Sequence, residues 1–234
     1  MSFNFEKQST FKIIIIMKTL KSVINNQFRN NALLITMACF AVCLLITRVA
    51  IARSEFYFFL AWNIFLAYVP LGITGYMIDR PHLIEKRHYF YPLFFAWLMF
   101  LPNAPYIITD FIHLKRETSI PIWFDVLLLI SFSLSGLLFG IKSMKQMFLM
   151  LAVRFNYFMT WGIMLIISFL TGFGIYLGRF LRYNSWDILH KPLELVQCIF
   201  VSLTVCPECK TSWGMTLGFG VFMFLAFIMY PEPE

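Results

Sequence analysis

The chain has 234 residues, of which 60% are hydrophobic and only 13% are charged, and its mean hydropathy is +0.75. An ordinary soluble domain carries about 25% charged residues, because its surface must stay wetted. This composition excludes an ordinary soluble protein and predicts an all-α, integral membrane helical bundle. The net charge of +7 does not indicate a nucleic-acid partner. Lys and Arg lie in short stretches between apolar segments, where membrane topology explains them.

Six apolar segments are long enough to cross a membrane as helices, which takes about 20 residues. In chain order the predicted spans are residues 32–52, 56–78, 89–108, 121–141, 157–178 and 213–230. Residues 1–31 form a basic N-terminal tail, residues 32–230 the transmembrane domain and residues 231–234 a C-terminal tail. Pro70 lies inside the second span and predicts a kink there.

Two further apolar stretches are too short to span alone. Residues 146–153 either extend the fourth helix or lie on the membrane surface. Residues 193–205 contain Glu194 and Gln197, and we predict an interfacial or re-entrant segment there. A crossing by residues 193–205 would instead move the C-terminus to the other side.

Polar residues concentrate where the third and fifth spans end and the fourth begins. If the N-terminus is cytoplasmic, these three places meet at the non-cytoplasmic face. We expect a binding cluster there, made of Asn103, Asp110, His113, Asp125, Arg179, Arg182, Asn184 and Asp187.

Arginine at membrane depth is costly unless it reaches the interface or finds a partner. On a continued helix, Arg179 and Arg182 lie on one face, because they are three residues apart. Their expected partners are Asp110, Asp125 and Asp187. Such pairs either lock the helix ends together or bind an anionic group such as a lipid phosphate, which suits the bidentate geometry of Arg.

Asn103 lies between Pro102 and Pro105, and these prolines are expected to break the third helix. A broken helix leaves carbonyl groups that need donors, and Asn or Arg side chains can supply them. Asn103 is therefore expected to join the cluster.

Two weaker motifs indicate other chemistry. Asp110 and His113, like Asp187 and His190, are three residues apart, so that each pair could offer two metal ligands from one helix face. Cys206 and Cys209 form a single CxxC, which predicts a disulfide if that loop faces an oxidising compartment. We expect no cofactor.

Three G-x-x-x-G pairs allow helices to approach closely, within one bundle or between subunits. They are Gly136/Gly140, Gly174/Gly178 and Gly214/Gly218. Packing inside one chain is the favoured interpretation, and a homo-oligomer or a membrane partner subunit is the alternative.

The segments FLPNAPYIITDFIHL (100–114), WFDVLLLISFSLSG (123–136) and GFGIYLGRFLRYNSWD (172–187) resemble a family of uncharacterised bacterial multi-pass membrane proteins, known as a domain of unknown function. The resemblance covers roughly residues 32–230. It implies the bacterial inner membrane, and it implies no activity, substrate or catalytic residue.

The favoured function is a non-enzymatic binding or assembly component with membrane lipids, anionic ones included, as partners. One alternative is a small-solute or lipid transporter, although the spans lack the ionisable residues near the midplane that transport ordinarily uses. The other is a membrane-embedded, metal-dependent enzyme that uses Asp110, His113 and Asp187.

Both termini are predicted to be cytoplasmic. On this topology eleven Lys and Arg residues lie inside and seven outside, with Arg48 within the first span, as the positive-inside rule favours. Alkaline phosphatase fused after Glu234 should therefore be inactive. An active fusion would contradict this topology and favour a crossing by residues 193–205.

Overall fold

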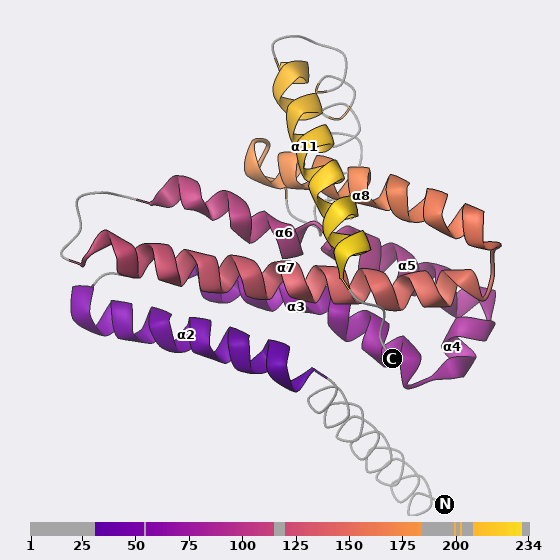
Figure 1. The fold of residues 1–234 in the computed structure, drawn as a ribbon, viewed down its shortest axis with the longest axis horizontal. Coiled ribbons are helices and arrows are strands. Elements are labelled where there is room, and N and C mark those ends of the chain that lie inside the picture. The colour runs from indigo at the N-terminus through magenta and orange to yellow at the C-terminus, as the bar shows by residue number, and fades with distance from the viewer. Residues whose placement is uncertain are drawn as a thin grey trace, which may run out of the picture.

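The computed structural model describes residues 31–53, 55–114, 120–183 and 208–230, together with 199 and 202. Every regular element assigned over the four continuous ranges is a helix (Figure 1). In chain order the elements are α2 (Ala32–Ala52), α3 (Phe59–Ile78), α4 (Pro81–Glu85), α5 (Arg87–Phe100), α6 (Asn103–Tyr106), the 3₁₀ helix η1 (Ile107–His113), α7 (Ile122–Ala152), α8 (Tyr157–Arg179) and α11 (Glu208–Met229). Most of the predicted interfacial segment 193–205 lies outside the described residues.

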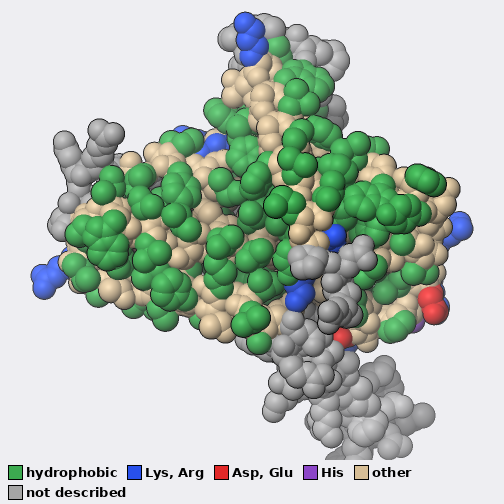
Figure 2. Space-filling view, viewed as in Figure 1, with side chains coloured by type: hydrophobic (Ala, Val, Ile, Leu, Met, Phe, Trp, Pro, Cys, Tyr) green, Lys and Arg blue, Asp and Glu red, His purple; other side chains and the backbone are tan. Residues whose placement is uncertain are grey.

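Within the part of the chain that the structure describes, six helical segments are long and apolar enough to cross a membrane. They are Ala32–Ala52, Phe59–Ile78, Arg87–Ile112, Ile122–Ala152, Tyr157–Arg179 and Cys209–Met229. The predicted all-α membrane bundle is therefore confirmed, while the side on which the termini lie stays a prediction. Hydrophobic side chains are spread over the face seen in Figure 2, and few charged side chains appear there, as lipid contact requires.

Helix α7 is the most buried of these segments and packs against α2, α3, α6 and η1. It continues to Ala152 without interruption, so residues 146–152 extend the fourth helix, which was one of the two expected alternatives. Its 31 residues reach about 46 Å at 1.5 Å per residue. That exceeds a hydrocarbon core of about 30 Å, so one end of α7 extends beyond the core if the helix stands upright.

The third span is broken, as its prolines predict. Helix α5 ends at Phe100, and α6 and η1 continue the chain after Leu101 and Pro102. Proline interrupts helical hydrogen bonding because it has no N–H to donate. This break brings η1 against α7, where the Ser133 hydroxyl donates to the carbonyl of Ile107 at 3.2 Å.

Glycines on α7 and α8 let the broken segment pack closely. A Cβ on Gly136 would lie 2.7 Å from the Ala104 carbonyl oxygen, and one on Gly140 would lie 2.7 Å from the Ala104 Cβ. A Cβ on Gly174 would overlap the ring of Pro102. The first two G-x-x-x-G pairs therefore pack inside the chain. A Cβ on Gly214 or Gly218 would meet no atom of the described residues within 4 Å, so their use between subunits stays a prediction.

Helix α11 packs mainly against α8 and runs across it in the view of Figure 1. At the contact, a Cβ on Gly172 would lie 2.6 Å from the Thr216 carbonyl oxygen and 2.9 Å from the Gly220 nitrogen. These are backbone atoms, which cannot rotate away. The glycine at 172 therefore sets how closely the two helices approach.

Gly172→Ala should separate α8 from α11 and lower the free energy of unfolding by about 1–3 kcal/mol, the usual cost of overpacking. The measurement is unfolding of the detergent-solubilised protein. Gly162→Ala on the same helix is the control, because its Cβ would lie more than 4 Å from every neighbouring atom that the structure describes. It should be neutral or stabilise α8 by up to about 1 kcal/mol. Equal effects of the two substitutions would contradict this contact.

Candidate functional site: a polar cluster beside a cavity

Arg179 and Asp110 form an ion pair that joins α8 to η1. The Arg179 Nη1 lies 3.0 Å from the Asp110 Oδ1, and the side chains are 12% and 1% exposed. The Arg179 Nη2 donates to the Thr109 carbonyl at 3.0 Å, which uses the guanidinium fork on two acceptors of one segment. The last residue of α8 is thereby tied to the broken third span.

Asn63 forms a hydrogen bond with the second oxygen of the Asp110 carboxylate. Its Nδ2 donates to the Asp110 Oδ2 at 2.9 Å, so each Asp110 oxygen has a donor. The Tyr106 hydroxyl lies 3.5 Å from the Arg179 Nη1 and accepts a weak hydrogen bond from it. We call Asn63, Tyr106, Thr109, Asp110 and Arg179 the polar cluster.

A second ion pair joins α2 to the start of α7. The Arg48 Nε lies 2.6 Å from the Asp125 Oδ1, and the Arg48 Nη2 lies 3.3 Å from the Asp125 Oδ2. Both side chains are buried, at 2% and 0% exposure. The guanidinium also lies over the Tyr57 ring, 4.3 Å from its centroid.

Tyr57 lies in the connection between α2 and α3, next to this ion pair. Burial raises the pKa of its hydroxyl above the ordinary value, and the negative charge of Asp125 raises the pKa further, while Arg48 lowers it. The tyrosine therefore stays neutral and contributes a ring face to the guanidinium.

The residues predicted for the cluster are only partly assembled. Arg179 and Asp110 meet, whereas Asp125 pairs with Arg48 instead of with Arg179 or Arg182. The Asn103 Nδ2 donates to the carbonyl of Phe100 at 2.9 Å, across the break in the third span.

Arg182 does not share a helix face with Arg179, because α8 ends at Arg179 and Arg182 has a left-handed backbone with φ 58°. It is exposed, and no hydrogen bond or ion pair joins it to another residue that the structure describes. Asn184 and Asp187 lie outside the described residues.

The metal and disulfide predictions stay untested as functional sites. His113 ends η1, and His190 and Cys206 are outside the described residues. Within the described ranges, no group of three His, Cys, Asp or Glu side chains could hold a metal. Cys209 lies near the start of α11.

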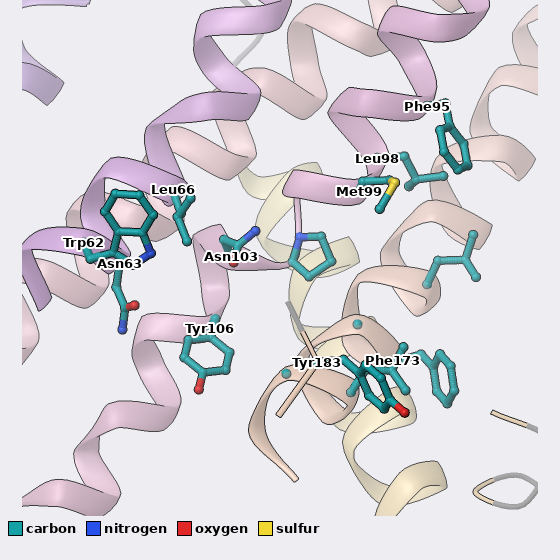
Figure 3. A pocket seen from close by; sticks show the side chains of 15 residues that line it. Trp62, Asn63, Leu66, Phe95, Leu98, Met99, Asn103, Tyr106, Phe173 and Tyr183 are labelled. Carbon is teal, nitrogen blue, oxygen red and sulfur yellow. The ribbon is translucent and has the colours of Figure 1, made fainter. Parts of the chain in front are cut away.

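A cavity of about 300 Å³ lies between α3, α5, α6 and α8, next to the polar cluster. Asn63, Asn103 and Tyr106 lie on one side of it in Figure 3, with Phe95, Leu98, Met99 and Phe173 opposite. Its other lining residues are Trp62, Leu66, Pro102, Leu170, Gly174, Leu177, Gly178 and Tyr183.

The cavity has lipid-facing residues on its border. Trp62 on α3, Phe95 on α5 and Leu170 on α8 are each about half exposed, and each belongs to a segment able to cross a membrane. In a bilayer, such exposed apolar side chains face hydrocarbon chains. The cavity therefore has both an apolar border and a polar side.

Comparison with known proteins shows the family. Residues 62–227 match the family model described as "Protein of unknown function (DUF1361)". The chain belongs to this family. No curated protein and no solved structure matches the chain.

The family match begins inside α3 and includes all residues that line the cavity. The match starts at residue 62, later than the residue 32 that the resemblance predicts, so α2 lies outside it. One buried ion pair therefore joins the matched region, through Asp125, to a helix outside it, through Arg48.

Sequence reasoning missed three residues that matter here: Arg48, Asn63 and Tyr106. Arg48 carried a usable signal, because an arginine within an apolar span requires a carboxylate partner. Asn63 and Tyr106 carried none, since single amides and tyrosines are common near helix ends. Only the fold shows that they border one cavity.

Arg48→Met should lower the free energy of unfolding by about 3–5 kcal/mol, because it leaves the Asp125 carboxylate buried without its cation. Adding Asp125→Leu should restore most of that loss, since an apolar pair needs no partner charges. Arg53→Met, in an exposed residue just after α2, is the control and should have little effect. Unfolding in detergent measures the wild type and these three variants, and a double variant no more stable than Arg48→Met would contradict the pairing.

Proposed function

We propose that this protein is a non-enzymatic, multi-pass component of the bacterial inner membrane that binds one hydrocarbon chain of an amphiphilic molecule. The chain lies in the cavity between α3, α5 and α8, and the polar end of the molecule lies at the polar cluster. The observation that carries the proposal is an apolar cavity that borders exposed membrane-facing side chains and a buried polar network.

The size of the cavity favours one chain. Ligand pockets measure about 300–1,000 Å³, and this cavity is at the lower limit. It has room for part of a single hydrocarbon chain rather than for a whole phospholipid. Burial of a chain among Phe95, Leu98 and Phe173 is favourable because aromatic and aliphatic side chains pack well against it.

A binding role also fits the state of the charged groups. Asp110 accepts hydrogen bonds at both oxygens, from Arg179 and Asn63. These bonds hold the carboxylate in one position, as a scaffold that shapes a binding site requires. The transporter and the metal-dependent enzyme remain the alternative hypotheses.

Filling the cavity tests the proposal. Leu177→Trp adds bulk to a lining residue of α8. It should weaken binding by about tenfold, because displacing two methylene groups at about 0.8 kcal/mol each costs that much. The measurement is photolabelling of the purified protein with a diazirine-bearing alkyl probe, with the labelled residues located by mass spectrometry.

Leu165→Trp is the matched control, on the same helix but away from the cavity. The probe should label cavity residues in the wild type and in Leu165→Trp equally. Labelling spread evenly over all lipid-facing helices, or unchanged in Leu177→Trp, would refute the cavity as a binding site. Melting temperatures of both variants verify that they are folded.

A further inference from the structure

The charges nearest the cavity are already matched to each other. Arg179 and Asp110 form an ion pair with no net charge, and the second arm of the guanidinium fork donates to Thr109. An anionic headgroup beside this pair would be attracted by Arg179 but repelled by Asp110, and a cationic one the reverse, so that neither gains a net counter-charge. Either would also have to shed water in a low-dielectric setting, which is costly without a full counter-charge.

The polar cluster instead presents an uncharged acceptor. The Asn63 Nδ2 donates to Asp110, and this orientation of the amide is fixed because an ionised carboxylate only accepts. The Asn63 Oδ1 is therefore directed away from Asp110. No hydrogen bond joins that oxygen to any residue that the structure describes, and Asn63 lines the cavity (Figure 3).

Tyr106 presents a donor on the same side of the cavity (Figure 3). Its hydroxyl oxygen accepts from Arg179 at 3.5 Å, which leaves its own proton to be donated. Among the described residues, no acceptor takes that proton. An acceptor on Asn63 and a donor on Tyr106 match a group that can both donate and accept, and a hydroxyl is the simplest one.

We propose that the cavity selects amphiphiles with an uncharged, hydrogen-bonding head, of which an alcohol is the type, over those with phosphate or ammonium heads. This inference rests on the proposed function, since it concerns the polar end of the same ligand. The head is thus recognised by the Asn63 amide oxygen and the Tyr106 phenol proton, and not by a bidentate arginine as in the sequence-based hypothesis of anion binding.

Competition against the alkyl diazirine probe tests the selection. The competitors are 1-dodecanol, dodecyl phosphate and dodecylamine, which share one chain and differ in the head. The charged amphiphiles are kept below their critical micelle concentrations, and dodecanol is kept below its solubility limit. The protein is first exchanged from detergent into an amphipathic polymer. Dodecanol should compete at concentrations about tenfold lower than either charged amphiphile, as expected when a head must be desolvated without a counter-charge.

Two variants separate the head from the chain. Tyr106→Phe should raise the dodecanol concentration needed by about three- to tenfold, the effect of one hydrogen bond, and should leave probe labelling intact. Tyr68→Phe is the control, because Tyr68 lies on α3, packs edge-on against Phe139 and does not line the cavity. It should change neither quantity.

The outcomes distinguish this inference from the proposed function. Equal competition by all three amphiphiles would overturn the inference and leave chain binding standing. Stronger competition by dodecyl phosphate would also overturn it and assign anion recognition to Arg179. Failure of every competitor, together with uniform labelling, would overturn both.

Discussion

The ion pair between Arg179 and Asp110 holds together the part of the molecule on which the candidate site depends. A guanidinium at the end of a membrane-embedded helix must reach water or find acceptors. Arg179 finds the Asp110 carboxylate and the Thr109 carbonyl, both on η1. Breaking the pair would leave a carboxylate that is 1% exposed without its cation, so the relative position of α8 and η1 is strongly constrained.

This pairing depends on the break in the third span. The chain interrupts the helix at Pro102 and continues, after α6, as the 3₁₀ helix η1, which carries both Thr109 and Asp110. The Phe100 carbonyl freed by the break accepts from Asn103. Thus the break leaves a backbone carbonyl that asparagine satisfies, and it precedes the segment that Arg179 binds.

The sequence predicts the membrane spans well and the ion pairs poorly, because the two depend on different properties of the chain. Span length and hydropathy encode lipid contact, so five of the six spans were placed to within a few residues, whereas the fourth continues well beyond its predicted end at residue 141, to Ala152. Pairing is different, because it depends on which helices become neighbours. Asp125 was expected beside Arg179, but α2 packs against α7 and supplies Arg48.

Close helix contacts were also only partly predictable. The G-x-x-x-G spacing identified Gly136 and Gly174, which pack inside the chain, but it did not identify the contact of Gly172 with the backbone of α11. The spacing describes one helix face, whereas a crossing at a single point needs only one glycine on each helix. Gly220 on α11 completes that crossing.

The cavity is explained by the same small residues that allow close packing. Gly174 and Gly178 face Pro102 and Tyr106 and also line the cavity. A larger side chain at either position would push the broken segment away from α8 or fill the space between them. Glycine therefore brings the polar cluster close to α8 while leaving room beside it, and Arg179, one residue beyond Gly178, reaches Asp110. The same two glycines therefore explain both the close approach of the polar cluster to α8 and the cavity beside it.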